Sequence, residues 1–273
     1  MKKIIVLTDF SNQSEQALKA ASDLAKKHKV ELLVVHMLEL NQAIITSPDG
    51  MYIEQTVFLV KLAEKNLKEF LEKPYLEGVT VTPVIKHYKV FSELNAIAKE
   101  HDADLIVMGS NGASGFEEMF IGSNAEKVVR NATVPVLVIK GEITNLSLDR
   151  FVFACDFNDD NLPAFQKAKE FAEMLGASME VVFINTPNDE FLSNRDAYQK
   201  INKFLTKANS AQQVEIYNDY SVEQGILNYG NTILADAIAM PTHGRKGISH
   251  LFNGSIGEDV VNHARIPVIT FKI

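Results

Sequence analysis

One part of the sequence indicates the fold most clearly: Asp104-Leu-Ile-Val-Met-Gly109-Ser-Asn-Gly112, then nine residues, then Gly122-Ser123, and finally Val134-Pro-Val-Leu-Val-Ile-Lys140. The apolar run before Gly109 predicts a strand buried on both faces. The two glycines at 109 and 112 allow a tight turn and a close approach of backbone. Ser123 is in the position of a helix N-cap, and apolar residues follow it at helical spacing. A strand, a glycine loop and a helix N-terminus in this order form an anion site at the carboxyl edge of a parallel sheet.

The chain contains this arrangement twice. The second copy reads Asp236-Ala-Ile-Ala-Met-Pro241-Thr-His-Gly244, then nine residues, then Gly254-Ser255. Gly112 corresponds to Gly244 at an offset of 132, whereas Asp9 in the first apolar run corresponds to Asp156 at an offset of 147. The difference, 147 − 132 = 15, means that the second copy lacks 15 residues between these points. The segment 188–207 is where the missing residues are most easily placed.

Apolar segments alternate with amphipathic ones in both copies, which predicts an α/β fold with helices on both faces of a parallel sheet. We expect two tandem, open, Rossmann-like sheets of five strands each, in domains 1–141 and 149–273. The short polar connection between them predicts close packing of the two copies. The expected helices are 14–27, 52–71, 92–99 with Ser92 as a cap, a fourth that begins after Ser123, and 163–175, 196–207 and 222–232 in the second copy.

Composition limits the class of protein. The chain of 273 residues is 46% hydrophobic, which suits globular domains, and no apolar run approaches the roughly 20 residues that cross a bilayer. Its net charge of −8, without a basic stripe, argues against nucleic-acid binding. The single Cys155 excludes an intrachain disulfide, and we expect it to be a buried small hydrophobe. The N-terminus shows no signal-peptide pattern. These features predict a cytoplasmic protein without a membrane partner.

Four segments of the first copy together resemble the ATP-binding members of the universal stress protein family. They are the run Ile4 to Ser11, the run Leu32 to Met37, the Gly-x2-Gly-x9-Gly-Ser motif, and the closing run Val134 to Lys140. The resemblance implies an adenine nucleotide alpha hydrolase-like fold and a site for ATP, with Mg²⁺ accompanying a triphosphate. It assigns binding to Thr8, Asp9, Met37, Gly109, Gly112, Gly122, Ser123 and Asn124.

Each of these residues has an expected role. The resemblance implies that Asp9 contacts adenine and ribose and that the backbone of Met37 contacts adenine. The glycines would admit the ribose and phosphates, while the amides of residues 122–124 and the Ser123 hydroxyl would hold phosphate. The alternative for Asp9 is a purely structural role, in which it caps a helix that begins near Ser11. His36 is expected to be a packed strand residue.

The second copy departs from the motif. Pro241 replaces the first glycine, which removes an N–H and fixes φ, and Cys155 stands where Thr8 stands in the first copy. The possible second site retains Asp156, Gly244, Gly254 and Ser255. Two interpretations follow: a weakened nucleotide site, or an altered copy kept for packing. We favour the altered copy.

No catalytic residue or metal site can be assigned from the sequence. There is no Gly-x4-Gly-Lys-[Ser/Thr] run and no zinc-ligand spacing. We therefore expect an ATP-binding sensor or switch in the stress response that is read by an unknown protein partner. The alternatives are a slow ATPase or nucleotide-transfer enzyme, and a binder of another small ligand in the second copy. The runs Val134 to Ile139 and Ile266 to Phe271 are expected to pair within the chain as a pseudo-dimer, with a further homodimer left open.

Overall fold

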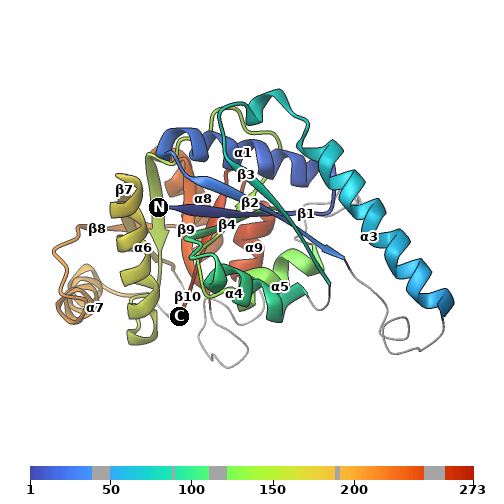
Figure 1. Cartoon of the computed structure of the whole chain (residues 1–273). Coiled ribbons are helices and arrows are strands. Elements are labelled where there is room, and N and C mark those ends of the chain that lie inside the picture. Colours follow the sequence, from blue (N-terminus) through green and yellow to red (C-terminus); the bar gives the residue numbers. More distant parts are fainter. Residues whose placement is uncertain (39–49, 88–89, 111–121, 188–190, 243–255) are drawn as a thin grey trace.

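The computed structural model describes residues 1–38, 50–87, 90–110, 122–187, 191–242 and 256–273 (Figure 1). Side chains are described over the same ranges, except at 50–53, 87, 90–92 and 256–258. Among the predicted site residues, Gly112, Gly244, Gly254 and Ser255 lie outside the described part of the chain. None of the helices in the described ranges is long and apolar enough to cross a membrane.

The first half alternates strands and helices as the sequence predicts. Its strands are short apolar runs, and the central ones, such as Leu105–Gly109, are buried at every residue. The elements are β1 (Lys3–Thr8), α1 (Asn12–His28), β2 (Glu31–Leu38), α3 (Gly50–Leu71), β3 (Val81–His87), α4 (Val90–Glu100), β4 (Leu105–Gly109), α5 (Ser123–Asn131) and β5 (Val136–Ile139).

The second half repeats this order. Its first long helix after the second strand, α7, has 14 residues where α3 has 22, so helix length accounts for 22 − 14 = 8 of the residues missing from this copy. The elements are β6 (Arg150–Ala154), α6 (Leu162–Leu175), β7 (Ser178–Asn185), α7 (Asn194–Lys207), β8 (Val214–Asn218), α8 (Val222–Thr232), β9 (Ala237–Thr242), α9 (Ile256–His263) and β10 (Val268–Lys272).

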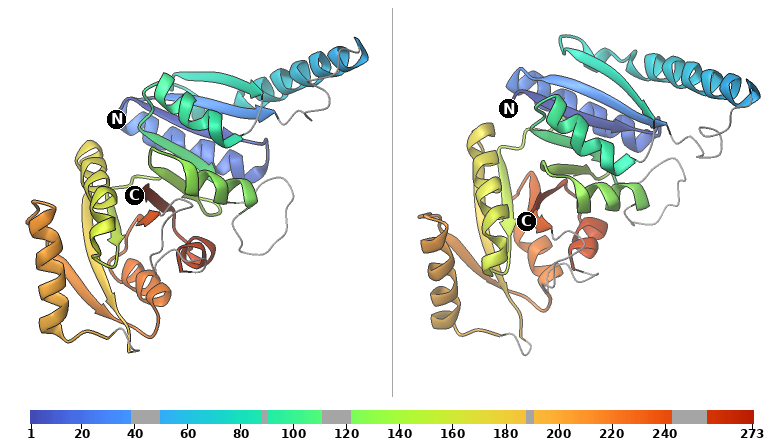
Figure 2. Two further views of the ribbon diagram at one scale, coloured as in Figure 1. Left: turned by 90° about the horizontal axis from the view of Figure 1, so that it is seen from below. Right: turned by 60° about the horizontal axis from the view of Figure 1, so that its bottom comes forward.

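The strands form one ten-stranded sheet in the order β3-β2-β1-β4-β5-β10-β9-β6-β7-β8. Pairing is parallel within each half, and the halves join where β5 and β10 pair antiparallel, with Val138 opposite Val268. The predicted α/β class, the two five-stranded parallel sheets and the intrachain pseudo-dimer are therefore confirmed. Figure 2 shows the two halves as lobes that meet along this joint.

Helices cover both faces of the sheet, each over its own apolar core. One core lies under α1, α3, α6 and α7, and includes Leu24, Phe70 and Phe165. The other lies under α4, α5, α8 and α9, and includes Ile97 and Val128. The sheet is thus the middle of three layers, and its strands are buried on both sides as parallel strands require.

Two lysines connect the halves in a reciprocal way. Lys140, directly after β5, donates to the backbone oxygen of Asn262 at the end of α9, over 3.2 Å. Lys272, in β10, donates to the backbone oxygen of Asn131 at the end of α5, over 3.3 Å. Each cation thus meets the negative end of the other half's last helix, which is a favourable position for it. Burial lowers the pKa of Lys140 to about 8.

Two predicted serine caps were wrong. Helix α4 begins at Val90, before the expected cap Ser92. Helix α5 begins at Ser123 itself, and its N-cap is Gly122, in an extended conformation with φ −63° and ψ 148°. Glycine is acceptable at this position, although it provides no side chain to cap the helix. Ser123 is therefore in the first turn, where its amide has no acceptor within the helix.

Candidate functional site

The reversal of strand order places the candidate site. From β1 the chain adds β2 and β3 on one side, and then returns to add β4 and β5 on the other. In sheets of this type, ligands bind outside the carboxyl ends of the two strands that flank the reversal. Here Thr8 ends β1 and is followed by Asp9, and Gly109 ends β4 and is followed by Ser110. The first half therefore brings predicted residues from distant parts of the chain to the same edge of the sheet.

Asp9 is exposed and held by a tight turn. Its Oδ1 accepts hydrogen bonds from the backbone N–H of Ser11 at 3.1 Å and from the Ser11 hydroxyl at 2.5 Å. Between them, Phe10 adopts a left-handed φ of 65°. The N-cap of α1 is Ser11, whose Oγ accepts from Ser14 N–H at 3.2 Å, so the suggestion that Asp9 caps this helix was wrong. Asp9 instead orients the capping residue and keeps its carboxylate at the surface.

Thr8 is buried beneath this turn. Its hydroxyl lies 3.0 Å from the Ser14 hydroxyl and accepts from the Phe10 backbone N–H at 3.0 Å. Because the side chain is 6% exposed and its oxygen is engaged in both contacts, Thr8 acts first as a support for the turn that presents Asp9. Ser14 was not predicted to be part of this support. The sequence signal for it was the spacing of two serines, because Ser14 lies three positions after the N-cap Ser11.

An aromatic cluster closes one side of the site. Phe10 stacks on His36 with ring centroids 4.3 Å apart, and meets Phe70 of α3 edge to face at 5.7 Å. His36 Nδ1 donates to the Thr8 backbone oxygen at 2.9 Å. His36 is thus a packed strand residue, as predicted, and it also fixes the end of β1. Met37 follows it in β2, pairs with Lys86 of β3, and is half-buried.

Gly109 has a packing role at the opposite strand end. A Cβ added there would lie 2.8 Å from the backbone oxygen of Gln13, in the first turn of α1. Real Cβ atoms do not approach a backbone oxygen so closely, so the residue must be glycine for α1 to pack against β4. The expected contact with ribose or phosphate remains a prediction, and this first role does not depend on it.

The N-terminus of α5 faces the same edge of the sheet. The Gly122 N–H donates to the Ser110 backbone oxygen at 2.8 Å, and Ser110 N–H donates to the Ile139 oxygen at 3.2 Å. The Gly122 amide, predicted to hold phosphate, is therefore used to fasten α5 to the end of β4. Ser123 and Asn124 are exposed in the first helical turn, where their N–H groups have no intrahelical acceptor. These two amides remain the phosphate-binding candidates.

The corresponding position in the second half is arranged differently. Both oxygens of Asp156 are engaged: Oδ1 accepts from Asn158 N–H at 2.9 Å and from the Asn161 amide at 2.5 Å, while Oδ2 accepts from the Asn158 amide at 2.7 Å. Phe157 repeats the left-handed conformation of Phe10, with φ 58°. It packs against Phe183 and Phe204, which replaces the His36 contact with a wholly apolar cluster.

Cys155 is buried under this turn, as predicted, and burial raises the pKa of its thiol well above the ordinary value. The thiol is therefore protonated at neutral pH, and a thiolate reaction at this position is disfavoured. Within the described ranges, no cluster of His, Cys, Asp and Glu could hold a metal ion. The described part of the first half is suited to binding an anion beside a polar surface with an aromatic cluster on one side.

Comparisons with known proteins agree with this architecture. The model of the Universal stress protein family matches residues 1–140 and 147–272. A universal stress protein of Methanocaldococcus jannaschii, MJ0531, is 31% identical over 139 residues, which are 51% of this chain and 82% of the relative. Slr1230 of Synechocystis, also a universal stress protein, is 24% identical over 304 aligned positions that cover 100% of both chains.

A solved structure has the same fold over almost the whole chain. A universal stress protein from Archaeoglobus fulgidus superposes with a TM-score of 0.70 at 23% identity, and the match covers 99% of this chain and 96% of the other. This likeness extends across both halves, so the joint between β5 and β10 lies within the shared architecture.

Proposed function

Because the chain belongs to the universal stress protein family, we propose that it binds ATP in its first half and acts as a cytoplasmic stress-response sensor. The observation that carries this proposal is the placement of Asp9 and the N-terminus of α5 on either side of the strand-order reversal. The exposed Asp9 carboxylate is suited to accept hydrogen bonds from ribose hydroxyls. The amides of Ser123 and Asn124 are suited to donate to phosphate oxygens.

We propose that the second half does not bind the nucleotide. Both carboxylate oxygens of Asp156 already accept hydrogen bonds from Asn158 and Asn161. Pro241, in β9, has no N–H to donate. The predicted stoichiometry is therefore one nucleotide per chain, with Mg²⁺ accompanying the triphosphate.

The two aspartates provide a matched test. The nucleotide released by denaturing freshly purified protein is quantified by chromatography and mass spectrometry, and binding of ATP with Mg²⁺ is measured by calorimetry. We expect one adenine nucleotide per chain, lost in Asp9→Ala and retained in Asp156→Ala. Two nucleotides per chain, or equal loss in both variants, would contradict the assignment to the first half, and no binding at all would refute the proposal.

Gly122→Val tests the close approach of phosphate to the N-terminus of α5. Gly122 has φ −63° and ψ 148°, a conformation that valine adopts readily, so the change adds bulk without backbone strain. We expect ATP affinity to fall at least tenfold while the free energy of unfolding changes by less than about 1 kcal/mol.

The sensor role has its own readout. If ATP contacts residues 122–124, hydrogen exchange in peptides spanning 110–124 should slow when ATP is added, and peptides from 151–161 in the second half should not change. If exchange were identical with and without ATP in both regions, the sensor role would be refuted. A binding result from calorimetry would still stand.

A further inference from the structure

Lys140 places its amine at the joint between the two halves without a carboxylate beside it. The residue follows β5 directly, is half-buried, and donates from Nζ to the backbone oxygen of Asn262 in α9 over 3.2 Å. In the part of the chain that the structure describes, Lys140 forms no ion pair with an Asp or Glu side chain. Its positive charge is therefore balanced only by the partial negative charge at the end of α9.

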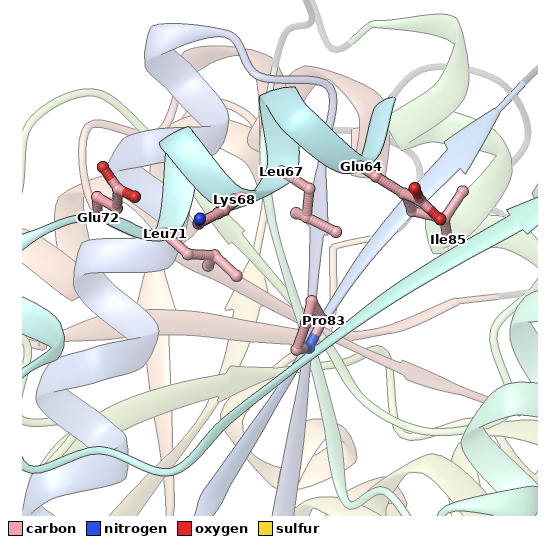
Figure 3. A pocket seen from close by; sticks show the side chains of 7 residues that line it. All are labelled: Glu64, Leu67, Lys68, Leu71, Glu72, Pro83 and Ile85. Atoms are coloured by element: carbon pink, nitrogen blue, oxygen red, sulfur yellow. The ribbon is translucent and has the colours of Figure 1, made fainter. Parts of the chain in front are cut away.

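Lys68 of α3 provides the contrast. Its exposed side chain lines an open groove between α3 and β3, together with Glu64 and Glu72, which lie four residues away on either side in the helix (Figure 3). Water and nearby carboxylates both stabilise a charged amine. Lys140 lacks the carboxylates and has lost part of the water, so the fold favours its neutral form more than a surface position does.

The ionisable side chains around Lys140 leave burial as the cause of this effect. Those described on the connection that follows it and on α5, α9 and β10 are Glu142, Glu126, Lys127, Arg130, Asp259, His263 and Lys272. Arg130 pairs with Glu126 at 3.0 Å, and His263 pairs with Glu223 of α8 at 2.5 Å. None of these groups contributes to the shift in the pKa of Lys140, which burial alone lowers to about 8.

The neutral amine is the reactive form of a lysine, because it has a lone pair to share. With a pKa of about 8, about one folded molecule in ten holds Lys140 as the neutral amine at pH 7. A lysine with the ordinary pKa of about 10.4 is neutral in only about one molecule in 2,500 at the same pH. As with thiols, a low pKa also makes the nucleophile weaker, so the gain in rate is smaller than the gain in population.

We propose that Lys140 is a site of covalent modification, at which its amine is acylated by an acyl phosphate. Nζ attacks the carbonyl carbon of the donor and forms a C–N bond, the C–O bond to the phosphate breaks, and inorganic phosphate leaves with the bonding electrons. The proton that Nζ loses is taken up by water. The donor is small, which suits an amine that is half-buried, and the reaction does not depend on nucleotide binding.

Acylation of Lys140 changes the joint itself. The amide product carries no charge, so the attraction between this side chain and the end of α9 is lost, and the acyl group needs room between β5 and α9. Lys272 makes the equivalent contact on the other side of the joint, where it donates to the backbone oxygen of Asn131 at the end of α5. It is therefore the matched control for the position of Lys140.

Site-resolved acetylation tests the proposal. The folded full chain is incubated with acetyl phosphate at pH 7, and the acetylated fraction of each lysine is followed by peptide mass spectrometry. We expect Lys140 to react at least about fivefold faster than Lys272 and Lys68. In urea-denatured protein the three rates should agree within about twofold, because the fold imposes the difference. A Lys140 that reacts no faster than the other two in the folded chain would overturn the proposal.

The pH dependence of the reaction identifies the neutral amine as its cause. The rate at Lys140 should level off above about pH 8 in the folded chain, and should go on rising to about pH 10 in the denatured chain. Lys140→Arg should remove the fast-reacting lysine, whereas Lys272→Arg should retain it. The proposal is also overturned by a fast-reacting lysine that persists in Lys140→Arg, or by a folded-state rate at Lys140 that rises as far as it does in the denatured chain.

Discussion

At the scale of single residues, the two halves show how equivalent positions acquire different roles. Asp9 and Asp156 follow equivalent strands and precede phenylalanines with the same left-handed backbone. Oδ1 of Asp9 accepts a hydrogen bond from the Ser11 hydroxyl, whereas Asp156 accepts from two asparagine amides, Asn161 at Oδ1 and Asn158 at Oδ2. The backbone of the turn is thus preserved, while the side chains that surround the carboxylate differ.

Gly109 gives a prediction that separates packing from binding. Gly109→Ala should destabilise the protein by about 1 to 3 kcal/mol, because the new Cβ must displace the α1 backbone at Gln13. Gly230→Ala in helix α8 is the matched control. A Cβ at this position would lie 3.4 Å from Cγ1 of Ile238 in β9, which is an ordinary contact distance. There we expect no loss, or a gain of up to about 1 kcal/mol from helix propensity. Urea denaturation of both variants measures the difference, and equal effects would contradict the packing role.

The sequence predicted Gly109 correctly as a special position, but only partly for the right reason. Its place after a buried strand indicated a close approach of backbone, and the chain itself provides the approaching group in Gln13. A contact between residues 96 positions apart leaves no local pattern. The cluster of Phe10, His36 and Phe70 was not foreseen for the same reason, because it forms only when α3 packs over the end of β2.

At the scale of elements, boundaries were less predictable than the elements themselves. The helices 14–27, 52–71 and 92–99 of the first half and 163–175, 196–207 and 222–232 of the second were predicted from apolar periodicity, which reports burial along an element and little about its ends. Ser123 and Ser92 were expected to cap helices because serine is favoured there, yet the helices begin one residue or more earlier in the chain than a serine cap requires. At α5 the amino end is fixed by the bond from Gly122 to Ser110, which is a tertiary contact.

Helix α1 gives a prediction at this scale. Ser11→Ala removes its N-cap and should cost about 1 kcal/mol of unfolding free energy. It should also weaken ATP binding, because Asp9 loses the hydroxyl that holds its carboxylate. Ser193→Ala removes the serine N-cap of α7, which lies in the second half. It should lower the free energy of unfolding by a similar amount and leave ATP affinity unchanged. Chemical denaturation and calorimetry on the two variants provide the comparison; a parallel loss of binding in both would contradict the role of the Asp9 turn.

At the scale of the whole molecule, the joint between the halves was predictable because two exposed strand edges of similar apolar sequence need cover. The sequence could not reveal how the joint is reinforced. Lys140 and Lys272 correspond at the repeat offset of 132, since 140 + 132 = 272, and each crosses to the other half. Their carbonyl acceptors at the ends of α9 and α5 become visible only in the folded chain.

Lys140 makes stability depend on pH. Burial lowers its pKa to about 8 in the folded state, against about 10.4 when the chain is unfolded. Below pH 8 the amine is protonated in both the folded and the unfolded chain. Between the two pKa values the unfolded chain holds the proton and the folded chain does not. The free energy of unfolding therefore rises with pH in this range. Relative to Lys140→Arg, which stays charged, the natural protein should gain at most about 3 kcal/mol between pH 7 and 10. A flat difference in urea denaturation across this range would refute the buried position of the amine.

The covalent connection between β5 and β6 has a consequence for evolution and for dosage. Two separate chains that pair through such strands dissociate on dilution. As long as one gene encodes both chains, their sequences must also be identical. Here the partner is always present at a high effective concentration, so the joint forms at any expression level. Each copy can also change alone: the second has Pro241 in place of the first glycine and is 15 residues shorter, whereas the first has the whole motif. One molecule therefore carries one candidate nucleotide site, whose assembly does not depend on how much protein the cell contains.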